Sequence, residues 1–238
     1  MKLSIIIPVF NEEKTIAEIL DRVNKVSIRD VQKELIIVND GSTDATASEI
    51  KNQKSKIKNF RIITHSKNLG KGAAIRSGIK QASGDYILIQ DADLEYDPKS
   101  YNKLISPILQ KKSKVVYGTR LKRLPNLSKD ERTLRFLLHY IGNKALSLLT
   151  SILYGQWITD METGYKIFPK KAIMNMRINA KGFEFEPEIT AKLLKSGFRI
   201  DEIPITTNPR GYKEGKKLQT VKDGLKALST LIKYRFGD

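Results

Sequence analysis

The sequence contains no cysteine and only two histidines among its 238 residues. The absence of cysteine excludes disulfide bonds, thiol nucleophiles and cysteine-ligated zinc, and it fits a reducing compartment. The two histidines, His65 and His139, lie far apart in the chain, so a histidine metal cluster is not expected. Metal binding or catalysis is therefore expected to depend on oxygen ligands and on charged side chains.

The sequence also lacks an unbroken apolar run of the roughly 20 residues that a membrane-spanning helix needs. The most apolar region, residues 134–158, is interrupted by polar residues and glycines, among them His139, Asn143 and Lys144. Apolar residues there, and again at 218–236, recur at helical spacing. This spacing predicts peripheral amphipathic helices that lie on a membrane surface or, equally for the second one, pack on the protein core. With no cleavable signal at the start, we expect a cytoplasmic protein that is peripheral on the cytoplasmic face of a membrane.

The sequence has few acidic residues relative to basic ones. It contains 43 Lys and Arg but only 26 Asp and Glu, which gives a net charge of +17. More of the excess lies after Thr119, and an anionic membrane surface is an expected partner. A basic chain can also bind nucleic acid, but no helix-turn-helix, zinc-finger or RNA-recognition signature is present. We therefore expect no nucleic-acid partner.

Apolar segments at residues 2–9, 34–38, 60–64, 86–89 and 115–118 have the length and composition of buried strands. Helical patterns stand between them, for example at 14–26 and 71–81. This alternation predicts an α/β fold with a mainly parallel, Rossmann-like sheet flanked by helices. The hydrophobic content of 40% is enough for one core, so we expect a single domain over residues 1–238.

Three acidic residues, Asp91, Asp93 and Glu95, directly follow the strand predicted at 86–89. The carboxyl ends of strands in an open α/β sheet are where ligands bind. Clustered carboxylates repel one another unless a cation or hydrogen bonds neutralise them. Because hard divalent cations prefer oxygen ligands and bridge carboxylates to phosphates, the cluster predicts a metal and diphosphate site. A solvated acidic turn is the simpler alternative.

Polar residues also follow the other predicted strands: Asn11 and Glu12 the first, and Asp40 the second. The third strand leads into Gly70 and Lys71, a glycine-containing helix entry whose N–H groups and lysine can bind anions. These residues point to one composite site built from several strand ends.

Four segments resemble the signature segments of family 2 glycosyltransferases, in the same order and with similar spacing. They are Ile-Ile-Pro-Val-Phe-Asn-Glu-Glu at 6–13, Val-Asn-Asp-Gly-Ser-Thr-Asp at 38–44, Asn-Leu-Gly-Lys-Gly-Ala-Ala at 68–74 and Asp-Ala-Asp-Leu at 91–94. The resemblance is close over the first half and looser beyond it. It implies an inverting enzyme of the GT-A fold that uses a nucleotide sugar.

The resemblance assigns roles on the donor side, in a nucleotide-sugar half spanning 1–118. Asp91 would lie near the ribose and diphosphate. Asp93 would be the main ligand of Mg²⁺ or Mn²⁺, with Asp91 and Glu95 as further carboxylates. The nucleoside pocket would be lined by Pro8, Asn11, Glu12 and Asp40. Lys71 would contact the nucleotide sugar.

Three later segments, 158–168, 182–189 and 209–218, resemble those of polyprenyl-phosphate sugar transferases, the branch that includes dolichyl-phosphate mannose and glucose synthases. The Gln-x-x-Arg-Trp segment of processive polysaccharide synthases is absent. The resemblance thus implies hexose transfer from GDP-mannose, UDP-glucose or UDP-N-acetylglucosamine to polyprenyl or dolichyl phosphate, through an acceptor half at 119–238.

A phosphate acceptor is already ionised near neutral pH, so its main requirement is cations that hold it against an anionic donor. Arg120, Arg135 and Arg210 are the favoured candidates, followed by Lys217. The basic segment at 119–135 is either a lid over the donor site or a surface loop.

Asp160 and Glu162 stay open as a general base, as groups that orient sugar hydroxyls, or as partners of the arginines. A base would be required in the alternative function, transfer to a saccharide or protein hydroxyl by a soluble family 2 enzyme. A basic binding module on a degenerate transferase fold is a further alternative, which the intact acidic cluster disfavours.

Overall fold

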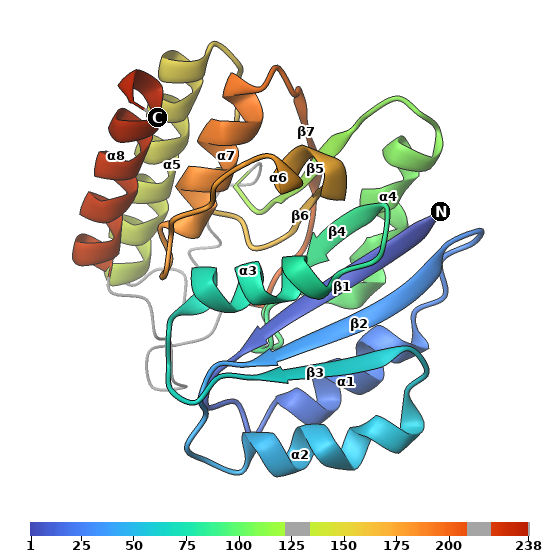
Figure 1. Cartoon of the computed structure of the whole chain (residues 1–238). Coiled ribbons are helices and arrows are strands. Elements are labelled where there is room, and N and C mark those ends of the chain that lie inside the picture. Colours follow the sequence, from blue (N-terminus) through green and yellow to red (C-terminus); the bar gives the residue numbers. More distant parts are fainter. Residues whose placement is uncertain (122–133, 209–219, 238) are drawn as a thin grey trace.

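A seven-stranded sheet runs through the computed structural model, with helices on both faces (Figure 1). The structure describes residues 1–121, 134–208 and 220–237, except for the side chains of 134, 135, 220 and 221. The strands are β1 (Lys2–Val9), β2 (Gln32–Asn39), β3 (Phe60–Thr64), β4 (Tyr86–Ile89), β5 (Val115–Thr119), β6 (Lys166–Pro169) and β7 (Ile200–Pro204). The helices are α1 (Ile16–Lys25), α2 (Thr46–Gln53), α3 (Lys71–Gln81), α4 (Tyr101–Leu109), α5 (Leu134–Tyr154), α6 (Lys170–Met174), α7 (Phe185–Lys195) and α8 (Thr220–Phe236), with 3-10 turns η1 (Lys54–Lys56) and η2 (Pro98–Ser100).

The strand order β3-β2-β1-β4-β6-β5-β7 places a topological switch point between β1 and β4. The chain moves outward on one side through β2 and β3 and then returns to the other side of β1 as β4. The four strands pair in parallel, as do β5 and β7, whereas β6 is antiparallel to both β4 and β5. The prediction of a mainly parallel sheet flanked by helices is confirmed.

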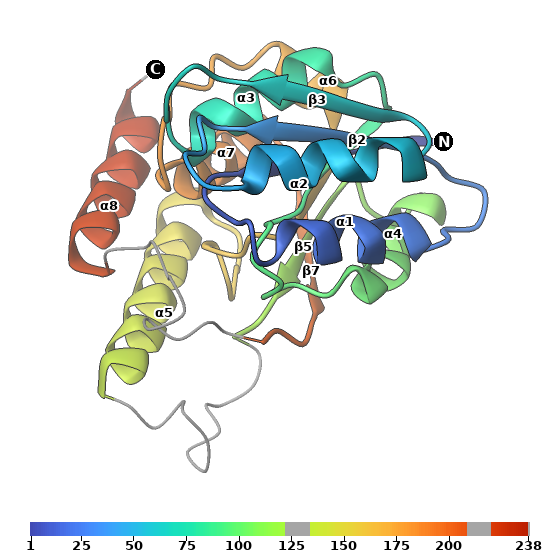
Figure 2. The same cartoon turned by 90° about the horizontal axis from the view of Figure 1, so that it is seen from below.

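Alternate residues of each central strand enter two separate cores. On β1, Ile5 and Ile7 pack with α1, α2 and α4, whereas Ile6 faces the opposite side with α3 and α7. Figure 2 shows α1, α2 and α4 together on one face of the sheet. Because a strand alternates its side chains, a sheet covered on both faces needs apolar residues in succession, as Ile5-Ile6-Ile7 supplies.

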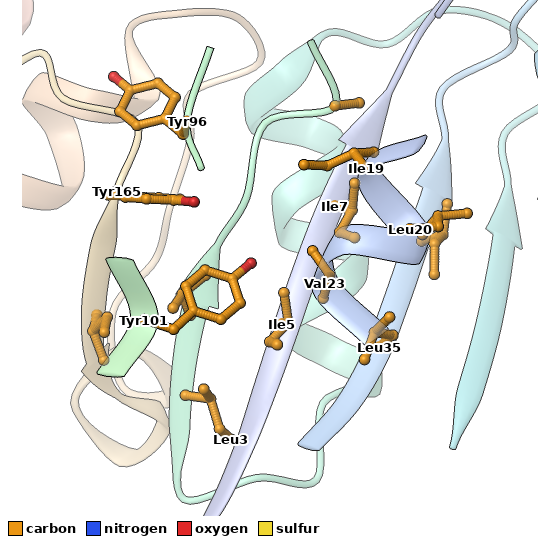
Figure 3. Close-up of a cluster of buried hydrophobic side chains, with 14 of the residues drawn as sticks. Leu3, Ile5, Ile7, Ile19, Leu20, Val23, Leu35, Tyr96, Tyr101 and Tyr165 are labelled. Atoms are coloured by element: carbon orange, nitrogen blue, oxygen red, sulfur yellow. The ribbon is translucent and has the colours of Figure 1, made fainter. Parts of the chain in front are cut away.

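Three tyrosines fix the segment that follows β4 (Figure 3). The ring centroids of Tyr96 and Tyr165 are 4.7 Å apart, and those of Tyr101 and Tyr165 are 5.8 Å apart. The hydroxyls of Tyr101 and Tyr165 donate to Gln90 Oε1 at 2.6 and 2.7 Å. Each buried hydroxyl is thereby satisfied, and the acidic loop starts from a rigid base.

Helix α5 buries several polar residues and exposes several large apolar ones, while Leu146, Leu149 and Leu153 pack against the core. Asn143, Ser147, Thr150 and Ser151 are buried, and the three hydroxyls donate to backbone carbonyls four residues earlier. The outward side exposes Leu138, Ile141, Leu148 and Ile152, with Ile152 71% exposed. By length and composition alone, Phe136–Tyr154 is long and apolar enough to cross a membrane, a test that core helices of soluble proteins also pass.

Helix α8 packs beside α5 and α7 at the edge of the molecule (Figure 1). Ala227, Leu231 and Tyr234 are its buried residues among those described, while Leu225 and Ile232 are 62% and 46% exposed. The helix therefore both packs on the protein and presents apolar residues to its surroundings, so neither of the two predicted roles describes it alone.

Candidate active site

A cavity of about 390 Å³ opens at the carboxyl ends of β1 and β4, at the switch point of the sheet. This is the place where open α/β sheets bind ligands. The loops after β1, β2 and β4 and the first turn of α3 supply most of its wall, and Arg120, α5 and residues 182–183 complete it. The lining residues are Pro8, Val9, Phe10, Glu12, Asp40, Asn68, Gly70, Lys71, Ala74, Asp91, Ala92, Asp93, Glu95, Tyr96, Arg120, His139, Gly182 and Phe183.

Asp93 occupies an acidic corner of this cavity, with Asp91 and Glu95 nearby. Its Oδ1 accepts a hydrogen bond from the Glu95 N–H at 3.1 Å. Burial, reinforced by repulsion from Asp91 and Glu95, raises the pKa of Asp93 to about 7. A carboxylate that is this costly to ionise is one that a nearby cation would stabilise.

The acidic corner fits a hard divalent cation by the chemistry of its donors, because every candidate ligand is a carboxylate oxygen. No three Asp, Glu, His or Cys side chains within the described ranges are arranged to hold a metal ion by themselves. Mg²⁺ commonly takes only one or two protein carboxylates and completes its shell with phosphate oxygens and water. Asp93, with Asp91 or Glu95, matches such a partial donor set.

Lys71 faces the acidic corner from the first residue of α3. Its Nζ lies 2.8 Å from Asp91 Oδ1 and 2.9 Å from Glu186 Oε1. Burial opposes the charge, but the two carboxylates outweigh it and raise the pKa of Lys71 well above its usual value. The lysine and the N-terminus of α3 together present positive charge to an anionic ligand.

Gly70, directly before Lys71, has no room for a side chain. Its φ is 97°, and a Cβ there would lie 2.3 Å from the carbonyl oxygen of Lys181. Only glycine combines this backbone conformation with such a close approach. The start of α3 therefore packs closely against Lys181 and Gly182, in the segment that completes the cavity wall.

The predicted nucleoside residues divide into two groups. Pro8, Glu12 and Asp40 line the cavity, whereas Asn11 does not. Asn11 has φ 48°, and its side-chain oxygen accepts a hydrogen bond from the Thr43 N–H at 2.8 Å. Asn11 thus ties the loop after β1 to the loop after β2 and shapes the wall from behind.

Arg120 lines the cavity, and its guanidinium group is fixed by hydrogen bonds to the buried carboxylate of Asp160. Its Nε and Nη2 donate to the two carboxylate oxygens of Asp160 at 2.8 Å each, and its backbone N–H adds a third bond at 2.8 Å. Burial opposes ionisation of Asp160, but Arg120 overcomes this and keeps the pKa of Asp160 below its usual value. Glu202 fixes the same loop by accepting from the Thr159 and Asp160 N–H groups.

Glu162 is half-buried, does not line the cavity, and interacts electrostatically with Glu186, Lys166 and Arg120. Glu162 Oε1 and Glu186 Oε2 are buried without a hydrogen-bond partner. Burial, followed by repulsion from Glu186, raises the pKa of Glu162 to about 8. Burial likewise lowers the pKa of neighbouring Lys166 to about 8, although the carboxylates counteract it. Glu162 is thus stabilised as a neutral acid at pH 7.

Sequence reasoning missed four contributors to the site: Tyr96, His139, Phe183 and Glu186. Tyr96 follows the acidic cluster, and its hydroxyl accepts the Gly164 N–H at 2.8 Å. Phe183 and Glu186 lie in the segment 182–189, whose resemblance already indicated the acceptor side. This resemblance could have identified them as site residues. His139 comes from an apolar helix, where nothing in the sequence pointed to the cavity.

Several acceptor-side predictions fall outside the described part of the structure. Arg210 and Lys217 lie in residues 209–219, and most of the candidate lid lies in 122–133. Arg135 is in the first turn of α5, but its side chain is not described. The structure therefore brings Arg120, Lys71 and the three acidic residues of 91–95 to one cavity and leaves Arg135, Arg210 and Lys217 as predictions.

Comparison with known proteins shows similarity over most of the chain. The model of the family described as glycosyl transferase family 2 matches residues 4–176. An uncharacterized protein of Methanocaldococcus jannaschii is 30% identical over 97% of this chain and 91% of its own length. The UDP-N-acetylglucosamine–dolichyl-phosphate N-acetylglucosaminyltransferase of Methanococcus voltae is 28% identical over 98% and 96%. The dolichol-phosphate mannosyltransferase of Pyrococcus furiosus is 28% identical over 98% of this chain but 64% of its own length.

The fold has close counterparts among solved structures. Glucosyl-3-phosphoglycerate synthase from Mycobacterium tuberculosis, in complex with Mn²⁺, uridine diphosphate and phosphoglyceric acid, matches with a TM-score of 0.73. The match covers 100% of this chain and 79% of that one at 19% identity. The likeness identifies the fold as GT-A, as the resemblance to family 2 glycosyltransferases implied.

Proposed function

The chain belongs to glycosyl transferase family 2, and we propose that it transfers a hexose from a nucleotide sugar to polyprenyl or dolichyl phosphate, with inversion at the anomeric carbon. Relatives named for a dolichyl-phosphate acceptor support this acceptor class. Their names state different sugars, so the donor stays open among GDP-mannose, UDP-glucose and UDP-N-acetylglucosamine.

On the donor side, Pro8, Glu12 and Asp40 would contact the nucleoside, and Lys71 would contact the diphosphate. Asp93, with Asp91 or Glu95, would hold Mg²⁺ or Mn²⁺. When bound, the cation supplies charge neutralisation for the departing nucleoside diphosphate. Lys71 and the N-terminus of α3 add fixed positive charge beside the acidic corner, where Lys71 pairs with Asp91.

The acceptor assignment is carried by the positions of Asp160 and Glu162. A hydroxyl acceptor needs a base within hydrogen-bond reach of its proton. Neither carboxylate lines the cavity; Asp160 is fully buried with both oxygens engaged by Arg120, and Glu162 is stabilised in its neutral form. An ionised phosphate needs no such base, and Arg120 offers it a positioned guanidinium.

An acceptor comparison tests this proposal. The purified protein, with its nucleotide sugar and Mg²⁺ or Mn²⁺, should glycosylate a short polyprenyl phosphate and leave the matching polyprenol unmodified. Arg120→Ala should impair transfer because one anion must be held against another. Arg135→Ala and Arg210→Ala should do the same if these cations complete the acceptor site. A free alcohol or a simple sugar that reacts better than the lipid phosphate would favour the soluble, hydroxyl-directed alternative.

A thermal-shift experiment tests the donor site independently of the acceptor. UDP or GDP with Mn²⁺ should stabilise the wild-type protein, because a ligand that binds the native state raises its stability. Asp93→Asn should lose this stabilisation. Asp21→Asn, which alters an exposed helix carboxylate paired with Lys25, is the matched control and should keep it. Equal metal-dependent shifts in both variants would contradict the assignment of Asp93.

The outward side of α5 supports a peripheral position on a membrane, and we propose that this is the cytoplasmic face. An exposed row of Leu138, Ile141, Leu148 and Ile152 is costly in water and favourable in the headgroup region. Neighbouring α8 adds exposed Leu225 and Ile232 and four exposed cations: Lys222, Lys226, Lys233 and Arg235. Apolar residues flanked by cations are complementary to anionic lipid.

Vesicle sedimentation tests this position. Binding should favour vesicles with anionic lipid and weaken with salt, since surface charges are screened within about 10 Å at 0.1 M. The double change Leu148→Ser and Ile152→Ser should reduce binding without unfolding the protein. Met174→Ser, which alters an exposed apolar residue on α6, serves as control. Unchanged sedimentation of the double variant would exclude this side of α5 as the membrane surface.

A further inference from the structure

Asp40, His65 and Ser77 form a line of hydrogen-bonded groups behind the nucleoside wall of the cavity. His65 Nδ1 lies 2.6 Å from Asp40 Oδ1, and His65 Nε2 lies 2.9 Å from Ser77 Oγ. Asp40 follows β2, His65 follows β3, and Ser77 is on α3. The line therefore connects three elements that surround the donor cavity.

The carboxylate of Asp40 is almost fully engaged by the protein. Oδ1 accepts from His65 and from the Leu69 N–H at 3.0 Å, and Oδ2 accepts from the Gly70 N–H at 2.8 Å. A carboxylate offers about four acceptor positions. One position, on Oδ2, is left for a ligand, and Asp40 lines the cavity.

Asp40 determines which nitrogen of a neutral His65 carries the hydrogen, because an ionised carboxylate can only accept. Nδ1 then donates to Asp40, and Nε2 accepts from the Ser77 hydroxyl. Without Ser77, the imidazole ring loses the hydrogen bond that holds its far side. Asp40 would then keep a donor but lose its fixed orientation.

We propose that His65, held by Ser77, is a positioning residue that aims the remaining acceptor of Asp40 at a ring N–H of the nucleobase. The inference rests on the proposed function, in which Asp40 contacts the nucleoside. A single acceptor at this point selects bases with a ring N–H, which uracil and guanine have and adenine and cytosine lack.

The same order of contacts occurs in serine hydrolases, but here it does not place a nucleophile in the site. Ser77 is not among the residues that line the cavity. The carboxylate end of the line, rather than the hydroxyl end, reaches the ligand space. The arrangement therefore fits the support of Asp40 and not covalent catalysis.

Two substitutions of His65 separate its two hydrogen bonds. The side-chain amide of Asn in His65→Asn can replace Nδ1 as the donor to Asp40 but cannot reach Ser77. The longer side chain of Gln in His65→Gln places its amide near the position of Nε2. This variant keeps the hydrogen bond to Ser77 and loses the hydrogen bond to Asp40. Dissociation constants for UDP, GDP, ADP and CDP with Mg²⁺ are measured by calorimetry, along with donor KM, kcat and thermal stability.

The wild-type protein should bind UDP or GDP more tightly than ADP and CDP. His65→Asn should stay within about threefold of wild type, whereas His65→Gln should bind about tenfold more weakly, as expected for losing a hydrogen bond to a charged group. Ser77→Ala should fall between them. In His65→Gln the donor KM should rise while kcat is kept, whereas a folding defect would lower apparent kcat at constant KM.

Wild-type affinity in His65→Gln, or equal weakening in both His65 variants, would overturn the positioning role while leaving the proposed function intact. Equal affinity of the wild type for all four nucleotides would overturn the base selection by Asp40. A wild-type protein that binds no nucleoside diphosphate would overturn both this inference and the proposed function.

Discussion

Replacing Glu162 by Gln or Ala distinguishes a neutral structural acid from a catalytic base. Glu162 is half-buried, its Oε1 is buried without a hydrogen-bond partner, and desolvation and Glu186 raise its pKa to about 8. Gln imitates the protonated carboxyl group in shape and polarity, whereas Ala removes it. We expect E162Q to keep much of the wild-type activity and E162A to lose it.

The same raised pKa gives Glu162 a defined effect on stability. In the unfolded chain Glu162 ionises near 4.5, but in the folded protein it keeps its proton up to about 8. Its contribution is therefore fully present below 4.5 and is lost as the pH rises toward 8. The loss is roughly 1.4 kcal/mol per pH unit and roughly 5 kcal/mol over the whole window.

E162Q has no carboxyl group to ionise, so its stability advantage over wild type should grow between pH 5 and pH 8. The expected growth is about 4 kcal/mol, or on the order of 10 °C in melting temperature for a chain of this size. Denaturant and thermal unfolding are measured in EDTA at each pH. Glu18→Gln, an exposed helix residue paired with Arg22, is the control and should show no such trend.

Two results would refute this reasoning. A stability difference between E162Q and wild type that does not change with pH would mean that Glu162 is not ionising against a buried environment. Activity as low in E162Q as in E162A would mean that the ionised carboxylate acts as a base. The second result would also favour a hydroxyl acceptor.

Two further predictions concern the supports of the site, and a third concerns Glu34 at the opposite end of the sheet. Asp160→Asn leaves the Arg120 charge without its carboxylate and should destabilise the protein by about 3–5 kcal/mol while impairing transfer, as unfolding and kinetics would show. Gly164→Ala should reduce nucleotide affinity in calorimetry, because its Cβ would lie 2.3 Å from Asp91 Oδ2. Although burial opposes it, hydrogen bonds from Ser4, Ser83 and Lys2 lower the pKa of Glu34 to about 2. Its stabilising effect should be present above pH 4.5 and fade as pH falls toward 2, so the deficit of Glu34→Gln in acid titrations should disappear there.

Local patterns predicted the elements that carry the donor site. The strands expected at 2–9 and 60–64 have those bounds, and the acidic cluster follows β4 at the switch point. These features depend on apolar runs and turn residues, which act over a few positions. The antiparallel insertion of β6 between β4 and β5 depends on long-range pairing, which no local pattern encodes.

Side-chain roles within the site were harder to predict because they depend on distant partners. Asn11 follows β1 as expected but turns to Thr43 instead of the cavity. Asp160 is separated from Arg120 by forty positions, yet it is engaged by that arginine on both oxygens. Helix α5 departs from the usual pattern, in which a surface helix buries apolar residues and exposes polar ones. Its Ser and Thr hydroxyls can be buried at little cost because they bond to carbonyls of their own helix.

The charges around the cavity imply that nucleotide and cation bind cooperatively. Among the described residues, ionisable carboxylates outnumber cations there: Asp91, Asp93, Glu95 and Glu186 stand against Lys71 and Lys166, while Asp160 and Arg120 pair with each other. A diphosphate adds negative charge to this surplus, so its affinity should rise about tenfold or more when Mg²⁺ is present, and Mg²⁺ affinity should rise by the same factor with nucleotide. Calorimetric titrations in both orders measure this factor, which Asp93→Asn should reduce toward one. Nucleotide affinity that is equal in EDTA and in Mg²⁺ would show that the diphosphate lies away from the acidic corner, against Lys71 and the N-terminus of α3 alone.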